Sequence, residues 1–239
     1  MTLQGKRIVV LGGSSGLGLS TAQAAAREGG LIVIASSKQA RIEAALATLP
    51  EGSAGYALDL GDPDSVQALF AGLGSFDHLV YTAGEALQLG PLSDTDPLAA
   101  QRFFRIRYWG AFFAAKYGSP NLRQGGSIVF TSGMSAHRPH SGWSLGASIC
   151  SAMEGLTRAL AVELAPLRVN IVCPGLVETP LWDGMEEEAR TTLYRNAAAR
   201  LPVGHVGTAN EVAEAYLYLM RQTYGTGQVL KVDGGGALV

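Results

Sequence analysis

The chain has 239 residues, of which 47% are hydrophobic and 16% charged, a composition that excludes a disordered chain and suits one large α/β domain. Its net charge of -2 gives no reason to expect nucleic acid or an anionic membrane as a partner. The only cysteines, Cys150 and Cys173, have no metal-site or disulfide spacing, and neither a secretion signal nor a membrane-spanning apolar run is evident, so we expect a cytoplasmic protein without a metal.

Short apolar runs alternate along the chain with longer amphipathic stretches, which is the pattern of a parallel sheet built from strand–helix–strand units. In chain order, we predict strands over residues 8–11, 31–35, 56–58, 78–81, 127–131, 168–172 and 228–232. The predicted helices are residues 17–27, 39–48, 63–70, 98–117, 145–164 and 211–220, with a helical insert over residues 181–200. No repeat or linker interrupts this order, so residues 1–239 are predicted to form one domain.

The first predicted strand and helix are joined by a glycine-rich turn, Gly-Gly-Ser-Ser-Gly-Leu-Gly, over residues 12–18. Strand, tight turn and helix together open a dinucleotide-binding unit, although the spacing G-x-x-x-G-x-G differs from the G-x-G-x-x-G fingerprint. Gly12 permits the sharp turn, Gly16 allows the backbone to approach a pyrophosphate, and Gly18 lets helix and strand pack closely. The free N–H groups at the helix start suit an anion, so we predict nucleotide binding here.

The end of the second predicted strand carries no acidic residue that would bind a ribose 2′-hydroxyl. It reads Ser36-Ser37-Lys38, with Arg41 one turn later. Cations at this place accommodate a 2′-phosphate, so the sequence favours NADP(H) over NAD(H). Asp59, at the end of the third strand, either accepts a hydrogen bond from an adenine amino group or simply ends the strand.

Several motifs along nearly the whole chain resemble the short-chain dehydrogenase/reductase family. They are residues 12–18, Asp59-Leu60, Thr-Ala-Gly at 82–84, the segments 154–166 and 168–180, and the C-terminal stretch 225–235. The resemblance implies a Rossmann-type, doubly wound parallel sheet of about seven strands with helices on both faces, a small-molecule substrate, and a homodimer or homotetramer. It also implies that residues 181–200 form a substrate lid, and that Trp143 and Trp182 line the cleft.

The strand ends and the resemblance together give a set of expected NAD(P)-binding residues. Val177 and Thr179 enter through the resemblance alone, which implies that they contact the nicotinamide amide. The expected residues are Gly12, Ser14, Ser15, Gly16, Leu17, Gly18, Ser37, Lys38, Asp59, Leu60, Ala83, Gly84, Pro174, Gly175, Val177 and Thr179.

The resemblance implies four catalytic residues, Asn, Ser, Tyr and Lys, and the sequence departs from all of them. The ungapped register from residue 154 backwards places the tyrosine position on Gly146 and the lysine position on Cys150. The serine and asparagine positions fall on Gly133 and Arg107, and Thr82 replaces the asparagine of an Asn-Ala-Gly motif. A phenol with a pKa near 10 needs a neighbouring cation to act as a base at neutral pH, so tyrosine-dependent hydride transfer is predicted to be lost or altered.

Six side chains near these positions are considered as replacements: Tyr81, Ser132, His137, His140, Ser144 and Cys150. Ser132 and His140 are the preferred candidate acids, because serine adjoins the expected site and histidine titrates near neutral pH. His140 is alternatively a loop histidine that faces water. Cys150 is either a thiol activated near a helix start or a small packing residue. Arg107 either binds an anionic substrate, fills the space left by tyrosine and lysine, or faces solvent beside Arg102 and Arg105.

Three functions are compatible with these residues. The first is an NADP-binding member of the family with weak, altered or absent redox activity. The second is a working reductase with a rebuilt acid, Ser132 or His140, or with water in that role. The third is a non-redox enzyme, catalysing isomerisation, elimination or cyclisation, or a binding scaffold that uses the same cleft.

Overall fold

The computed structural model describes residues 2–239, and its centre is a sheet of seven parallel strands in the order β3-β2-β1-β4-β5-β6-β9. The strands are β1 Arg7–Leu11, β2 Leu31–Ser36, β3 Ala54–Ala57, β4 Phe76–Tyr81, β5 Leu122–Thr131, β6 Arg168–Pro174 and β9 Val229–Val232. Two short strands, β7 Val177–Glu178 and β8 Gly207–Thr208, pair separately. The strand order reverses between β1 and β4, where open sheets of this kind bind ligands. The prediction of about seven parallel strands is confirmed.

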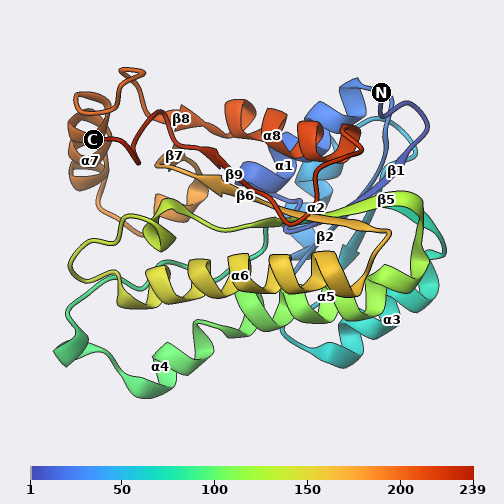
Figure 1. Cartoon of the computed structure of the whole chain (residues 1–239), viewed down its shortest axis with the longest axis horizontal. Coiled ribbons are helices and arrows are strands. Elements are labelled where there is room, and N and C mark those ends of the chain that lie inside the picture. Colours follow the sequence, from blue (N-terminus) through green and yellow to red (C-terminus); the bar gives the residue numbers. More distant parts are fainter. Residues whose placement is uncertain (1) are drawn as a thin grey trace.

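Helices cover both faces of the sheet (Figure 1). They are α1 Gly16–Arg27, α2 Gln39–Leu46, α3 Pro63–Leu73, α4 Pro97–Arg102, α5 Ala111–Gly118, α6 Ser144–Glu163, α7 Glu187–Ala198 and α8 Ala209–Arg221. One buried apolar cluster joins α3, α5 and α6 to one face, and a second joins α1, α2 and α8 to the other. The near-continuous apolar strands are buried on both sides, as a doubly wound parallel sheet requires.

The predicted single helix over residues 98–117 is wrong, because the structure divides this segment. Helix α4 ends at Arg102, a π-helical turn spans Arg105–Gly110, and α5 follows. The Glu85 carboxylate accepts hydrogen bonds from the backbone N–H groups of Ile106 and Arg107, and the Tyr81 hydroxyl donates to the Ile106 carbonyl. Because these backbone groups bond to side chains, they do not form the regular hydrogen bonds of an α-helix, which accounts for the wider π-helical turn.

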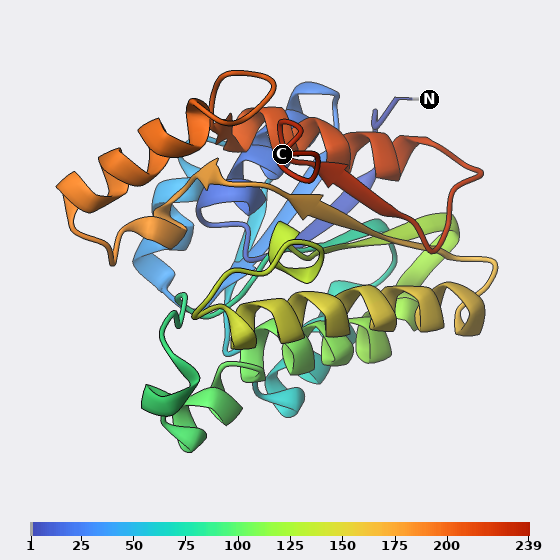
Figure 2. The ribbon, with the colours of Figure 1, turned by 60° about the vertical axis from the view of Figure 1, so that its left-hand side comes forward.

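Other boundaries move by smaller amounts. Strand β5 begins at Leu122 rather than at residue 127, since Leu122 pairs with Phe76 before a shift in register. Strand β3 lies two residues earlier than predicted at its start, and α3 extends to Leu73. Asp62 caps α3, because its side chain accepts the Ser65 N–H. The predicted helical insert contains α7, which lies with α4 at the end of the molecule where the strands terminate (Figures 1 and 2).

The glycine-rich turn brings β1, α1 and β4 into close contact. Gly12 has a φ of +89°, and a Cβ atom there would lie 2.5 Å from the Ala83 backbone nitrogen. A Cβ atom on Gly18 would lie 2.3 Å from the Gly12 carbonyl oxygen. The turn conformation predicted for Gly12 and the close packing predicted for Gly18 are therefore both present. No helix within residues 2–239 has the length and apolar character needed to cross a membrane.

The first prediction compares two glycines with nearly the same positive φ angle. Gly52 has a φ of +88° and nothing within 4 Å of its missing Cβ, whereas Gly12 meets the backbone of Ala83. Gly52→Ala is expected to cost about 1 kcal/mol of unfolding free energy, for the left-handed conformation alone. Gly12→Ala is expected to cost at least about 2 kcal/mol more, because backbone atoms must move. Urea unfolding measures both, and equal losses would show that the contact is unimportant.

The second prediction concerns His78, a buried residue of β4 whose Nδ1 lies 2.9 Å from the Ser127 hydroxyl. Burial lowers the pKa of His78 from 6.5 to about 4, with the positive charge of Arg168 acting in the same direction. The unfolded chain binds a proton at His78 more tightly than the folded chain does. The contribution of neutral His78 to stability is therefore complete above pH 6.5 and declines as the pH falls towards 4. The difference amounts to about 3 kcal/mol at most.

We therefore expect the unfolding free energy of the wild type to fall more between about pH 7 and about pH 4.5 than that of His78→Asn. Comparing the two proteins cancels the titration of the other groups. Parallel pH profiles for the two proteins would contradict the burial argument.

Candidate functional site

A cleft of about 660 Å³ opens at the carboxyl ends of the strands, beside the reversal between β1 and β4. Its walls come from the glycine-rich turn, the ends of β2 to β6, the π-helical turn and the segment before α7. Both the size and the position match ligand sites in open α/β sheets.

Thirteen of the sixteen residues expected to bind the cofactor line this cleft. They are Gly12, Ser14, Ser15, Gly16, Leu17, Gly18, Ser37, Asp59, Leu60, Ala83, Gly84, Pro174 and Thr179. Lys38, Gly175 and Val177 are not among the lining residues. The side chain of Val177 is buried, and its carbonyl accepts the indole N–H of Trp182 at 3.1 Å.

The start of helix α1 is suited to hold a phosphate group. Ser15 is the N-cap residue, but its side chain makes no capping hydrogen bond, so the first N–H groups of the helix have no side-chain partner there. Ser14 instead bonds to Ser36 at 2.8 Å, which ties the turn to the end of β2. An uncapped helix start with its positive dipole end at the cleft fits the pyrophosphate of a dinucleotide.

The end of β2 presents Ser36, Ser37 and Arg41 to the cleft. Arg41 is therefore the cation that lines this wall, and Lys38, the N-cap residue of α2, does not line it. Asp59 is half-exposed at the same wall and pairs with Arg105 at 2.9 Å. The hydrogen bond from Arg105 is the main reason why the pKa of Asp59 lies below its usual value.

Arg107 lies in the cleft and not on the exposed helix face that it would share with Arg102. Its guanidinium donates to the Glu85 carbonyl at 3.0 Å and lies so close to Gly84 that a Cβ atom there would be 2.4 Å from Cζ. Glu85 fixes the backbone of the same turn through its carboxylate. Sequence reasoning did not single out Glu85, although it follows directly on the Thr-Ala-Gly motif.

The other three positions that the resemblance assigns to catalysis lie close together. A Cβ atom on Gly133 would be 3.3 Å from the Cys150 sulfur, and one on Gly146 would have only ordinary contacts, 3.8 Å from Ser135 and 3.9 Å from Trp143. Burial raises the pKa of the Cys150 thiol, while a hydrogen bond from Ser135 and the charge of Arg107 act against that shift. Cys150 therefore behaves as a packing residue and not as an activated thiol.

No tyrosine or lysine is among the cleft-lining residues of the described chain, residues 2–239. Tyr81 is buried, and its hydroxyl donates to the Ile106 carbonyl. Tyr216 is also buried, with its hydroxyl 2.7 Å from that of Thr131. Burial is the main cause that raises the pKa of both phenols above 10, so neither is prepared to act as a base.

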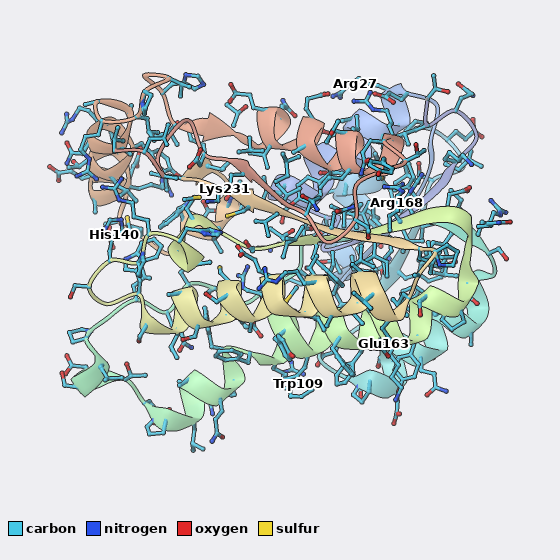
Figure 3. All side chains as sticks on the ribbon, in the orientation of Figure 1. Arg27, Trp109, His140, Glu163, Arg168 and Lys231 are labelled. Carbon is cyan, nitrogen blue, oxygen red and sulfur yellow. The ribbon has the colours of Figure 1, made fainter. Side chains whose placement is uncertain are left out.

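The two candidate acids are placed differently. Ser132, at the end of β5, lines the cleft, and its hydroxyl donates to the Glu154 carboxylate at 3.0 Å. His140 is exposed on the loop before α6, with its ring 6.0 Å from that of Trp143, and it does not line the cleft (Figure 3). The histidine that reaches Ser132 is His137, through Glu154.

Glu154 is a residue that sequence reasoning missed as a functional group. It lies four residues after Cys150 and eight after Gly146, so it occupies the same face of α6 as the expected tyrosine and lysine positions. That spacing was a usable signal. Glu154 is 5% exposed, unusual for a carboxylate, and hydrogen bonds from Ser132 and His137 account for its burial.

The segment of residues 181–200, which the resemblance predicts to be a substrate lid, contributes Leu181, Trp182, Gly184 and Met185 to the cleft. Trp182 is buried there, as expected, and lines the cleft. Trp143 instead packs against it from outside, with 6.5 Å between the ring centroids. Together with Leu87, Leu89 and Ile106, this segment forms an apolar wall at one end of the cleft.

Comparison with known proteins agrees with this arrangement. Residues 12–236 match the family described as enoyl-(acyl carrier protein) reductase. The chain is 35% identical to the short-chain dehydrogenase/reductase fsr5 of Gibberella fujikuroi, over 99% of this chain and 96% of that protein. It is 33% identical to the short-chain dehydrogenase/reductase malC of Malbranchea aurantiaca, over 98% and 95%.

Two solved structures are similar to this chain over nearly its whole length. A small-chain dehydrogenase in complex with NADPH matches with a TM-score of 0.87 and 36% identity, over 99% of this chain and 100% of that one. The MalC Reductase/Diels-Alderase of Malbranchea aurantiaca matches with a TM-score of 0.90 and 32% identity, over 98% and 96%. The chain therefore belongs to the short-chain dehydrogenase/reductase family, as an NAD(P)-dependent oxidoreductase.

Proposed function

We propose that this protein is an NADP(H)-dependent reductase of carbonyl compounds whose site uses Arg107 and Ser132 in place of the tyrosine–lysine pair. The observation that carries the proposal is the position of the Arg107 guanidinium, which lies over Gly84 inside the cleft. Burial raises the pKa of the Cys150 thiol, at the position that the resemblance assigns to lysine, and the Arg107 charge is close enough to act against that rise. The Arg107 guanidinium therefore lies near position 150, where the resemblance implies the cation of a lysine.

Arg107 has the donors that such a role needs. Among the described residues, its side chain makes one hydrogen bond, to Glu85, and guanidinium carries five N–H donors. The remaining donors are available to polarise a carbonyl oxygen and to stabilise the negative charge that grows on it. When bound, reduced nicotinamide supplies the hydride to the substrate carbon. Ser132 lines the cleft and His140 does not, which favours Ser132 as the group that meets the substrate oxygen.

The preference for NADP(H) rests on the wall at the end of β2. Ser36, Ser37 and Arg41 line it, and no acidic residue stands among them. A carboxylate would repel a 2′-phosphate, whereas a guanidinium binds it with two parallel hydrogen bonds. The structural relative described as a complex with NADPH supports the same choice.

A second candidate function is a cyclisation in the same cleft. The apolar wall of Leu87, Leu89, Leu181 and Trp182 suits a folded, largely apolar substrate. The relative described as a Reductase/Diels-Alderase combines a reduction with such a ring closure. The expected homodimer or homotetramer also remains a proposal, supported by the adjacent exposed rings of Trp109 and Phe112.

The third prediction tests the cofactor. Arg41→Ala is expected to weaken NADPH binding by about 10-fold to 100-fold, the value of one charge-assisted contact, and to leave NADH binding unchanged. Lys38→Ala serves as the matched control, because Lys38 lies three residues away and outside the cleft lining. Fluorescence titration of both nucleotides gives the affinities. Equal effects of the two substitutions would remove Arg41 from the 2′-phosphate site.

The fourth prediction tests the reaction. The wild type is expected to oxidise NADPH in the presence of at least one member of a panel of ketones, aldehydes and quinones. Arg107→Met retains much of the side-chain volume but removes its charge, so kcat is expected to fall by about 100-fold or more. The affinity for NADPH is expected to stay within a few-fold.

Arg102→Met is the control for this substitution, since Arg102 is exposed and makes only a surface ion pair at 3.9 Å. A wild type that binds NADPH but turns over no carbonyl compound would contradict the proposed reduction and leave the cyclisation as the better candidate. Full activity in Arg107→Met would show that another group stabilises the negative charge on the substrate oxygen.

A further inference from the structure

A buried carboxylate stands beneath the cleft, on helix α6, and three elements meet around it. Glu154 Oε1 accepts the hydroxyl proton of Ser132 at 3.0 Å and lies 2.9 Å from Nε2 of His137. Ser132 comes from the end of β5, and His137 follows the short 3₁₀ turn Met134–Ala136. One oxygen atom therefore joins the hydroxyl and the imidazole.

The two ends of this chain of hydrogen bonds face different surroundings. Ser132 lines the cleft, and the Glu154 carboxylate is 5% exposed. The side chain of His137 is 30% exposed, so its ring exchanges protons with solvent. The three groups thus form a continuous path from bulk water, through a buried carboxylate, to the wall of the site. Hydroxyl, carboxyl and imidazole groups each have an atom that can accept a proton and donate it again.

The same cluster has a second interpretation, which the chemistry disfavours. His137, Glu154 and Cys173 place one nitrogen, oxygen and sulfur atom within 4.8 Å of one another, a separation that suits a metal ion. The Glu154 oxygen of this group, however, already accepts hydrogen bonds from Ser132 and His137. The Cys173 sulfur lies 3.7 Å from the Met134 sulfur. These contacts among the protein's own groups favour proton transfer over a metal site.

We propose that Ser132, Glu154 and His137 form a proton relay that carries a proton from solvent to the substrate oxygen, an inference that rests on the proposed carbonyl reduction. For the transfer, the Ser132 hydroxyl turns from Glu154 to the substrate oxygen, and the carbonyl π bond breaks as the carbon gains a hydride and the oxygen gains the Ser132 proton. The Nε2 proton of His137 moves to Glu154 Oε1 and from there to the Ser132 oxygen, and His137 Nε2 regains a proton from solvent. In sum, one NADPH and one proton reduce one carbonyl group to an alcohol, with NADP⁺ as the oxidised product.

The relay explains how a site without tyrosine in its lining completes the reduction. Arg107 stabilises charge on the oxygen but does not give up a proton, because guanidinium stays protonated in proteins. The serine hydroxyl is a weak acid alone and needs a group behind it that replaces its proton in the same step. Glu154 occupies that position, on the face of α6 where the resemblance expects lysine one turn earlier and tyrosine two turns earlier.

The first experiment replaces the carboxylate by an amide. Glu154→Gln keeps the shape of the side chain but cannot pass on a proton. We expect kcat for the best carbonyl substrate to fall by about 30-fold or more, with NADPH affinity unchanged in fluorescence titration. Glu163→Gln is the matched control, because Glu163 is exposed at the end of the same helix and is expected to keep full activity (Figure 3).

The second experiment separates a relay from a structural role. His137→Ala is expected to lose at least about 10-fold in kcat and to recover activity with added imidazole, which enters the surface notch left by the ring. His140→Ala is expected to keep the wild-type rate and to gain nothing from imidazole. A merely structural His137 gives a variant that imidazole does not rescue, and that result would overturn its place in the relay.

A readout on the protein without cofactor checks the contact itself. In histidine-labelled wild type, NMR is expected to show a His137 Nε2–H signal with the chemical shift of a proton bonded to a carboxylate, and Glu154→Ala is expected to lose it. Absence of that proton in the wild type would overturn the contact. Removal of metal by a chelator is expected to leave activity unchanged; loss of activity that zinc restores would overturn the relay in favour of a metal site.

These results distinguish the relay from the proposed function. If the wild type reduces carbonyl compounds while Glu154→Gln and His137→Ala keep their rates, the relay alone is wrong. If the wild type binds NADPH but reduces nothing on the panel, both the reduction and the relay are wrong.

Discussion

The contact between Gly12 and Ala83 is the constraint on which the arrangement of this site depends. A Cβ atom on Gly12 would lie 2.5 Å from the Ala83 backbone nitrogen, so the end of β1 lies directly against the end of β4. Gly18 brings the first turn of α1 against the carbonyl of Gly12. The hydroxyl of Thr82 lies between the two glycines and donates to the Leu11 and Gly12 carbonyls. Three elements thus converge around one small side chain, which leaves the helix N–H groups directed at the space where the sheet order reverses. The cofactor site follows from that approach.

The same strand end also positions Arg107, through the residue that follows the Thr-Ala-Gly motif. Glu85 accepts the N–H groups of Ile106 and Arg107 with its carboxylate and the Arg107 guanidinium with its carbonyl. An acidic side chain here therefore holds a π-helical turn open and fixes the direction of its arginine. The helix is broken where the proposed chemistry needs a cation in the cleft, and π-helical turns in proteins frequently lie at functional sites.

Sequence reasoning predicted the sheet, the glycine-rich turn and most of the cleft wall because these depend on local patterns. Apolar runs that end at Gly12, Asp59 and Gly84 mark strand ends, and parallel strands bring their carboxyl ends to one edge. It did not predict the break in the helix over residues 98–117, since Glu85 acts on that segment from 21 residues away. It named both Lys38 and Arg41 as cations at this place but included only Lys38 among the expected binding residues, whereas Arg41 and not Lys38 lines the cleft. Sequence distance from a strand end does not give the direction of a side chain.

The choice between His140 and His137 shows the same limit. Both histidines lie in one polar loop, and residue type does not separate them. The difference is made by Glu154 of helix α6, which forms a hydrogen bond with His137 and none with His140. The spacing of Gly146, Cys150 and Glu154 put the carboxylate on the right face of α6, but its partners emerged only once β5 and the loop were placed beside that helix.

The positions at 107, 133, 146 and 150 depend on one another. The Cys150 sulfur would lie 3.3 Å from a Cβ atom at position 133, so glycine there accommodates cysteine at 150. A lysine at 150 would bring a second positive charge close to Arg107, whose charge already acts on the thiol, and would be nearly buried. Arginine at 107 and lysine at 150 therefore oppose each other, and a site that holds Arg107 in the cleft has a physical reason to carry a neutral residue at 150.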